Sequence, residues 1–165
     1  MSENVLEVKE LITAFRMESG EWLRAVDGVS FRVPKGKTVG IVGESGCGKS
    51  VTAMSIVGLL PKPMGHVLEG EVIFKGEDLT KADDDRMHEV RGGEIGVIFQ
   101  EPMTALNPVH RIGKQISEAL ILHRGMGKRE ALQESIQLLE KVGIPAPERR
   151  VMEYPHQLSG GDSRT

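Results

Sequence analysis

Short apolar runs separated by turn residues dominate the first hundred positions of the chain, a pattern typical of β-strands. Residues 5–12 and 24–33 are the two longest runs, with a polar turn at 18–21 between them. The simplest arrangement for two such runs is a hairpin or meander. Three further short runs have the composition of strands, and the first and last are of the buried type: 38–42, 71–74 and 95–99.

The pattern changes after residue 109, where apolar residues recur at the spacing of amphipathic helices. A turn at 125–127 separates two such runs, and Pro145 and Pro147 are expected to end the second. The apolar positions are Ile112, Ile116, Ala119, Leu120 and Leu122, then Leu132, Ile136, Leu138, Leu139 and Val142. We therefore expect an α/β protein, β-rich over about 1–100 and helical over about 101–165.

Three consecutive aspartates, Asp83, Asp84 and Asp85, suggest either a metal site or the start of a helix. Adjacent carboxylates on a helix point in different directions, and no calcium-loop spacing follows them. We therefore favour a short helix whose first turn receives their negative charge. It is expected to end near Arg91, where the glycines at 92–93 break it.

One segment carries a motif with a chemical mechanism. Residues 43–50 fit the phosphate-loop pattern G-x-x-x-x-G-K-[ST], between the predicted strand 38–42 and an apolar helical run at 51–60. Glycines let backbone N–H groups converge on phosphates, and the helix N-terminus that follows favours an anion. Lys49 would place a cation on the β- and γ-phosphates, and the Ser50 hydroxyl would ligate Mg²⁺. The alternative, a glycine-rich turn that binds nothing, is disfavoured by the strand–loop–helix order.

The residues expected to bind the nucleotide phosphates follow from this motif: Gly43, Glu44, Ser45, Gly46, Cys47, Gly48, Lys49, Ser50 and Val51. Two aromatic residues, Phe15 and Trp22, lie on either side of the first turn. Either ring could stack on an adenine or pack in the core, and composition alone favours the core.

Composition narrows the choice of partners and compartment. A formal net charge of −3 over 165 residues gives no basic footprint for nucleic acid. Cys47 is the only cysteine, which excludes an internal disulfide framework. No basic segment with an apolar core opens the chain, and no window approaches the ~20 apolar residues of a membrane span. We expect a soluble, cytoplasmic chain that can still dock on a membrane protein.

Four features occur in a characteristic order: the phosphate loop, Gln100 after the predicted strand 95–99, a helical segment, and LSGG at 158–161. This combination resembles the ATP-binding subunits of ABC transporters, and the resemblance covers nearly the whole chain. The segments VDGVSF, GIVGESGCGKS, FQEPMTALNP and YPHQLSGG are similar to those of one branch of this family. That branch energises the uptake of dipeptides and oligopeptides, or sometimes nickel. An unrelated P-loop NTPase, such as a kinase, is disfavoured by the same motifs.

The resemblance implies a P-loop NTPase core with N-terminal antiparallel strands and a helical subdomain. It implies that ATP and Mg²⁺ are the cofactors, that Phe15 stacks on adenine, and that Trp22 is the second choice. It also implies that Gln100 reaches Mg²⁺ or the attacking water, while Lys49 contacts the phosphates. The signature motif, which contacts the γ-phosphate bound to another subunit, would comprise Leu158, Ser159, Gly160 and Gly161.

The resemblance also implies partners and a location. The helices within 109–142 would meet transmembrane permease subunits, together with the loop at Gln100. A second ATP-binding subunit, identical or related, would complete the nucleotide sandwich. A periplasmic or extracellular substrate-binding protein would be an indirect partner, and no nucleic acid is expected. The chain would lie on the cytoplasmic face of the cell membrane as a peripheral subunit.

The chain departs from the family pattern near its C-terminus. Asp162 stands where the signature motif usually has glutamine, and no Walker B aspartate, catalytic glutamate or switch histidine follows. We therefore expect the N-terminal half of such a subunit, with open strand edges and marginal stability. A truncated or shifted reading frame, or a partial protein, would explain this half.

Two functions stay open. One is an ATPase subunit that couples ATP binding and hydrolysis to peptide import. The other is a nucleotide-binding module without ATPase activity. Hydrolysis by this chain alone is expected to be very slow or absent, because it needs a positioned water and a general base or polarising group.

Overall fold

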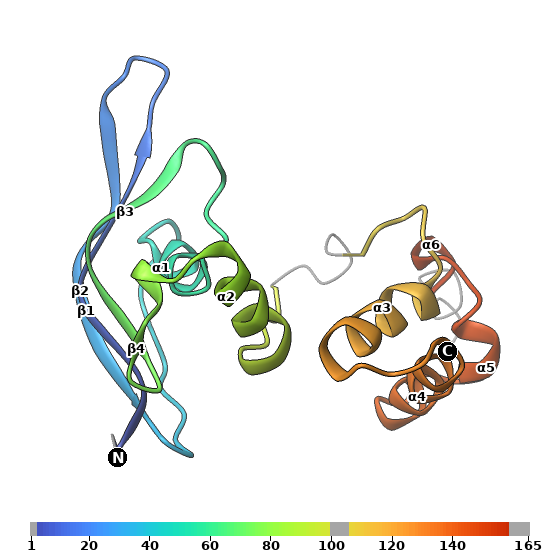
Figure 1. Cartoon of the computed structure of the whole chain (residues 1–165). Coiled ribbons are helices and arrows are strands. Elements are labelled where there is room, and N and C mark those ends of the chain that lie inside the picture. The colour runs from blue at the N-terminus through green and yellow to red at the C-terminus, as the bar shows by residue number, and fades with distance from the viewer. Residues whose placement is uncertain (1–2, 100–105, 159–165) are drawn as a thin grey trace. The chain divides into compact units, whose positions relative to one another are not determined.

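The computed structural model describes residues 3–99 and 106–158. The chain divides into two compact units, Met1–Val90 and Arg91–Thr165, which we call the sheet unit and the helical unit. Figure 1 shows the strands in the first unit and the helices α3 to α6 in the second.

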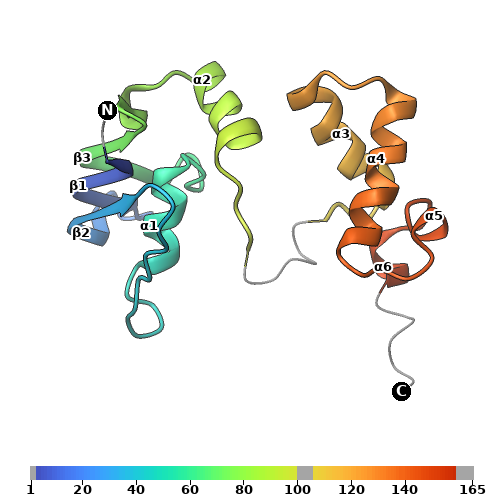
Figure 2. The ribbon, with the colours of Figure 1, turned by 90° about the horizontal axis from the view of Figure 1, so that it is seen from below.

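A four-stranded antiparallel sheet is the framework of the sheet unit, with the strand order β2-β1-β3-β4. Its strands are β1 (Asn4–Arg16), β2 (Trp22–Pro34), β3 (Gly65–Phe74) and β4 (Glu77–Asp78). The predicted hairpin is confirmed as β1 and β2, and the predicted strand 71–74 is the second half of the longer β3. Because β1 pairs with both β2 and β3, the first strand of the chain is central in the sheet (Figure 2).

Helix α1 (Lys49–Ile56) packs against this sheet (Figure 2). The buried hydroxyl oxygens of Thr13 on β1 and Ser55 on α1 lie 2.8 Å apart. The predicted helical run to residue 60 ends earlier, because Gly58 adopts a positive φ of 64° and the Leu59 N–H donates to the Met54 carbonyl. The buried apolar residues of the unit include Val8, Leu11, Val26, Ile56 and Val72.

Two predicted strands are wrong, because residues 38–42 and 95–99 form no regular structure. Val42 and Ile98, one in each run, are both 95% exposed. A strand is stable only when a neighbour pairs with its backbone. Within residues 3–99 and 106–158, no segment pairs with either run. Apolar, β-branched composition indicates what a strand can bury, but it does not supply the pairing partner.

Helix α2 (Asp84–Glu89) begins at the three aspartates, as predicted. Asp83 is its N-cap, and the Asp83 carboxylate accepts a hydrogen bond of 2.8 Å from the backbone N–H of Arg86. The expectation that the glycines at 92–93 break the helix is wrong. They lie inside a π-helical turn, η2 (Val90–Glu94), which continues the helix beyond its last α-helical residue.

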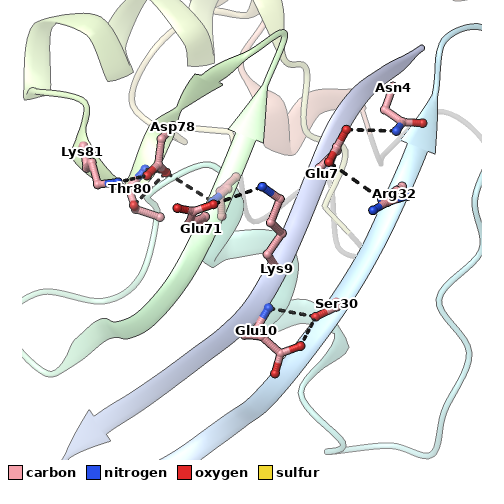
Figure 3. A network of polar contacts seen from close by, with 11 residues as sticks. Asn4, Glu7, Lys9, Glu10, Ser30, Arg32, Glu71, Asp78, Thr80 and Lys81 are labelled. Carbon is pink, nitrogen blue, oxygen red and sulfur yellow. Dashed lines mark hydrogen bonds and ion pairs between the residues drawn. The ribbon is translucent and has the colours of Figure 1, made fainter. Parts of the chain in front are cut away.

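Polar side chains link β1 to both of its neighbours (Figure 3). Lys9 on β1 forms an ion pair of 3.2 Å with Glu71 on β3. Toward β2, the backbone N–H of Glu10 donates to the Ser30 hydroxyl oxygen at 2.8 Å, and that hydroxyl donates to the Glu10 carboxylate at 2.6 Å. Exposed pairs of this kind each contribute about 0–1 kcal/mol, so they favour one strand register more than they stabilise the unit.

Asp78 closes the end of the sheet by capping the 3₁₀ helix η1 (Leu79–Lys81). The Asp78 carboxylate accepts hydrogen bonds from Thr80 and from the backbone N–H of Val72, and it pairs with Lys81 at 2.8 Å (Figure 3). Burial raises the pKa of Asp78, but the hydrogen bonds from Lys81, Thr80 and Val72 outweigh burial. The pKa of the carboxyl therefore lies below its ordinary value.

The helical unit contains α3 (Ile112–Arg124), α4 (Lys128–Lys141), α5 (Pro147–Arg150) and α6 (Pro155–Leu158). The two predicted helical runs are confirmed as α3 and α4. Their apolar faces meet in a cluster of Ile112, Leu139 and Val151, onto which Ile116, Ile136, Ile144 and Leu158 pack. The hydroxyl oxygens of Ser117 and Ser135 lie 3.0 Å apart in the buried contact between the two helices.

The predicted end of α4 at the prolines is wrong. The helix ends at Lys141, and Gly143 follows with a positive φ of 79°. Pro147 is instead the first residue of α5, where its missing N–H costs nothing. Among the helices of the described ranges, none has the length and apolar character needed to cross a membrane.

Candidate nucleotide-binding site

The predicted phosphate loop, residues 43–50, is an exposed turn that leads into α1. Gly46 and Gly48 have positive φ values of 83° and 90°, which side chains other than glycine rarely adopt. Gly48 is the N-cap of α1, and no side chain of the described residues caps the helix. The first N–H groups of a helix have no acceptor within the helix, so those of Lys49, Ser50 and Val51 have no partner inside α1. These donors, with the helix dipole behind them, are what an anion requires.

The Lys49 side chain folds back across the loop. Its ammonium nitrogen donates to the carbonyl oxygens of Gly43 at 2.7 Å and Glu44 at 2.6 Å, and it lies 3.5 Å from the Cys47 sulfur. An ammonium group has three donors and no acceptor, and two carbonyl oxygens and the sulfur lie within hydrogen-bond distance of it here. A cation is thus held over the loop, and no carboxylate of the residues that the structure describes pairs with it.

Gly48 joins the loop to the sheet. A Cβ atom at Gly48 would come closer than 3.0 Å to the backbone oxygen of Ala25 on β2, and would lie 3.5 Å from the Val26 side chain. Only glycine permits this approach, so the loop lies directly against β2, near the first residues of the strand. The sequence pattern identified Gly48 as part of the motif, but it gave no sign of Ala25, whose contribution is a backbone atom.

Strand pairing places the two candidate aromatic residues on opposite faces of the sheet. Thr13 contacts α1, and Phe15 lies two residues further along β1, so both side chains are on the α1 face. Trp22 pairs with Arg16, which is on the other face because side chains alternate along β1. The Phe15 ring is partly buried beside Gly65.

Trp22 has a structural partner on that other face. Its ring lies edge-on to His66, with 5.3 Å between the ring centroids. His66 pairs directly with Ala14, and Ala14 has no exposed surface although Trp22 remains 46% exposed. The Trp22–His66 pair therefore lies over Ala14, on the face away from α1.

The remaining predicted site residues lie away from the phosphate loop in the sequence, and the structure describes only one of them. Leu158, the first residue of the LSGG sequence, ends α6 and packs on the core of the helical unit. Gln100, Ser159, Gly160 and Gly161 lie outside the described residues. Arg150, which the sequence reasoning missed, is the last residue of α5 and donates a hydrogen bond to the backbone carbonyl of Gln157, the residue before Leu158. The only signal for it was a pair of arginines shortly before LSGG.

The site combines a glycine-rich loop, a lysine folded across it, a helix that begins at the loop and an antiparallel sheet beside it. This combination is typical of a nucleotide-binding class of protein. The chain belongs to the ABC transporter family, whose sequence pattern matches residues 26–165. The predicted family and α/β fold are confirmed, and the alternative of an unrelated P-loop NTPase is wrong.

Among curated proteins, the chain is similar to the oligopeptide transport ATP-binding protein OppD of Bacillus subtilis (strain 168). The two are 50% identical over 157 residues, which is 95% of this chain and 44% of OppD. It is also 50% identical over 159 residues to the dipeptide transport ATP-binding protein DppD of the same organism, covering 96% of this chain and 47% of DppD. The chain spans about half the length of the curated relatives that it matches.

Among solved structures, the chain is similar to the dimeric bacterial ABC transporter cassette MJ0796. The TM-score is 0.78 at 28% sequence identity, covering 94% of this chain and 64% of that one. A second structure of MJ0796, a post-hydrolysis state bound to ADP and Pi, has a TM-score of 0.74 at 28% identity, with the same coverage.

Proposed function

We propose that this chain binds ATP at residues 43–51 and is the ATP-binding part of a peptide importer. The observation that carries the proposal is the Lys49 ammonium, held over the loop by the carbonyls of Gly43 and Glu44. Phosphate oxygens are charged acceptors and form stronger hydrogen bonds with an ammonium group than carbonyls do. When a triphosphate binds, its oxygens can therefore replace the two carbonyls as hydrogen-bond acceptors of the Lys49 ammonium, with a gain in free energy. The first N–H groups of α1 lie beside this position.

The position of the loop favours Phe15 as the residue that stacks on the base. Phe15 pairs with Leu23, which lies two residues from Ala25, and the Ala25 carbonyl meets Gly48. With strands about 4.8 Å apart and about 3.3 Å per residue, the backbone of Phe15 lies about 8 Å from that contact. A ribose and its first phosphate can span this distance. Trp22, on the opposite face, would be out of reach.

The chain's own residues fit a partial Mg²⁺ site. Ser50 is the second residue of α1, and its side chain is exposed beside the loop. In the part of the chain that the structure describes, no group of three or more His, Cys, Asp or Glu residues gathers to hold a metal. Ser50, and Gln100 as the second proposed ligand, would therefore share the ion with phosphate oxygens and water, as Mg²⁺ commonly does. The ion would supply positive charge against the phosphates.

The proposed assembly follows from the names of the relatives, which are ATP-binding proteins of oligopeptide and dipeptide transport. We propose transmembrane permease subunits as partners of the helices within 109–142, and a substrate-binding protein as an indirect partner. A second ATP-binding subunit would receive residues 158–161 at its γ-phosphate, in line with the dimeric state of MJ0796. The chain would then lie at the cytoplasmic face of the membrane, with residues 1–100 as the nucleotide core and 101–165 as the helical subdomain.

The test of ATP binding is a titration with a fluorescent ATP analogue and Mg²⁺. The unmodified chain should bind saturably, and Lys49→Ala should weaken binding at least about tenfold, because a hydrogen-bonded charge contributes about 1.5–3 kcal/mol. Lys37→Ala is the matched control, since Lys37 is an exposed lysine shortly before the loop. Equal affinity of the Lys49 and Lys37 variants, or no binding by the unmodified chain, would contradict the proposal.

Hydrolysis is a separate proposal for the complete importer. Release of phosphate from MgATP by this chain, abolished in Lys49→Ala, would assign the ATPase step to it. Saturable binding without phosphate release would make the chain a nucleotide-binding module, and the hydrolytic groups would then belong to the rest of the assembly.

A further inference from the structure

A chain of buried hydroxyl groups joins α1 to the sheet. The side chains of Thr13 and Ser55 are both buried, and their hydroxyl oxygens lie 2.8 Å apart. The Ser55 hydroxyl also donates to the Val51 carbonyl oxygen at 2.7 Å, one turn earlier in α1. Because a serine hydroxyl has a single hydrogen, Thr13 is the donor in its contact with Ser55. The hydrogen bonds therefore run from β1 through Ser55 to the first turn of α1.

Helix α1 has a second attachment at its N-terminus. Gly48 approaches the Ala25 carbonyl on β2 as closely as a glycine allows. The buried Thr52 hydroxyl donates to the Gly48 carbonyl at 2.9 Å, which ties the end of the loop to the helix. From Gly48 to Ser55 the helix rises about 10 Å. A single contact would let the helix pivot on the sheet, whereas two contacts at this separation fix the direction of its axis.

The strand that receives Ser55 also carries the residue proposed to stack on the base. Thr13 pairs with Val26, the neighbour of Ala25, so both attachments of α1 lie at the same level of the sheet. Phe15 is two residues beyond Thr13 on the same face, about 7 Å along β1. The proposed base contact therefore belongs to β1, and the proposed phosphate contacts belong to the loop and α1. The hydrogen bond between Thr13 and Ser55 links these two parts of the site directly.

We propose that Thr13 is a positioning residue, which acts through Ser55 to align the phosphate donors of α1 with Phe15; this inference rests on the proposed function above. The first N–H groups of a helix point along its axis, so the direction of α1 decides where a bound triphosphate leads. If that direction changes, one nucleotide cannot keep both its phosphate contacts and its ring contact, and small displacements of this kind are costly. The Thr13 side chain has no exposed surface, so it touches no ligand itself. Its loss lowers the affinity for a nucleotide and leaves the affinity for a triphosphate without a base unchanged.

The test compares two ligands of the full 165-residue chain in the presence of Mg²⁺. One is an ATP analogue with its fluorophore on the ribose, which leaves the base unmodified. The other is inorganic tripolyphosphate, measured by its displacement of the analogue. Thr13→Val keeps the shape of the side chain and removes the donor, so it should weaken binding of the analogue about fivefold, the size of one hydrogen bond, and change binding of tripolyphosphate by less than about twofold. Thr13→Ser, which keeps the hydroxyl, should recover most of the loss.

Ser117→Ala is the matched control, because the helical unit contains the same arrangement. The hydroxyl oxygens of Ser117 and Ser135 lie 3.0 Å apart, and the Ser135 hydroxyl donates to the Ala131 carbonyl at 2.6 Å. Removal of the Ser117 hydroxyl should leave the affinity for both ligands within about twofold, although it also breaks a buried hydrogen bond. Urea unfolding reports how much stability each variant loses.

Three outcomes would overturn the positioning role of Thr13. They are equal losses of affinity for the two ligands in Thr13→Val, no loss for either ligand, and failure of tripolyphosphate to displace the analogue from the unmodified chain. Equal losses would make Thr13 a residue that only stabilises the fold. These outcomes leave ATP binding itself intact. A lack of saturable binding of the analogue by the unmodified chain overturns both this role and the proposed function.

Discussion

Gly48 and Gly46 offer a matched pair of substitutions within one loop. Both have positive φ, 90° and 83°, so an alanine at either position is strained by about 1–2 kcal/mol. They differ in their surroundings, because a Cβ at Gly46 meets no atom within 4 Å. At Gly48 it would come closer than 3.0 Å to the Ala25 carbonyl oxygen, and neither group is a flexible side chain that can move aside.

The overlap sets the size of the difference. Forcing an extra carbon into a packed contact costs about 1–3 kcal/mol, in addition to the backbone strain that the two variants share. Gly48→Ala should therefore be less favourable than Gly46→Ala by about 1–3 kcal/mol, divided between unfolding and nucleotide binding. If the loop moves off β2 to relieve the overlap, the N–H groups of Lys49 and Ser50 move with it, and affinity falls relative to Gly46→Ala, by about 5- to 150-fold when the whole difference appears in binding.

Two measurements separate these contributions. Urea unfolding of each variant gives the loss of folding free energy, and titration with a fluorescent ATP analogue gives the loss of affinity. Their sum should be larger for Gly48→Ala by the stated amount. If the two variants were indistinguishable in both assays, the contact between Gly48 and the Ala25 carbonyl would not govern the position of the loop, and the reasoning would fail.

Two further predictions concern the residue that stacks on the adenine base and the stability of the sheet unit at acidic pH. Phe15→Ala should weaken binding of the ATP analogue by about 5- to 150-fold, the range expected for loss of one aromatic stacking contact. Trp22→Ala should change it by less than about twofold, because Trp22 is on the other face of the sheet, and the reverse order would refute the assignment. The lowered pKa of Asp78 means that its ionised form stabilises the folded state above pH 3.8, and that this contribution is lost as pH falls through the folded value. The unfolding free energy should therefore decline less steeply in Asp78→Asn than in the unmodified chain between pH 5 and about pH 2, and parallel curves would contradict the role of the carboxylate.

The elements predicted correctly from sequence are those whose determinants are local. The hairpin, α3 and α4 follow from the periodicity of their apolar positions, and the turn that leads into α1 follows from its glycines, whereas its role as a phosphate loop stays a prediction. The start of α2 was predictable because Asp83 caps it with its own side chain. In each case the residues that decide the structure lie within a few positions of one another.

The errors concern properties that depend on distant partners. The apolar runs at 38–42 and 95–99 have strand composition, but pairing decides whether a strand forms. The choice between Phe15 and Trp22 was no error and stays a prediction, but the face of the sheet that each occupies follows only from the register of β1 with β2 and β3. Arg150 and Gly48 each contact a backbone carbonyl, and backbone contacts leave no mark in residue types.

The central position of β1 has a consequence for synthesis. Its β2 partner follows within a few residues, but its β3 partner begins at Gly65, after the loop and α1 have been made. At about 5–20 residues per second, several seconds separate the emergence of β1 from that of β3 on the ribosome. During that interval one edge of β1 is unpaired. The nascent hairpin is therefore exposed to wrong pairing until β3 has left the exit tunnel, and a chaperone that covers a strand edge would act in this interval.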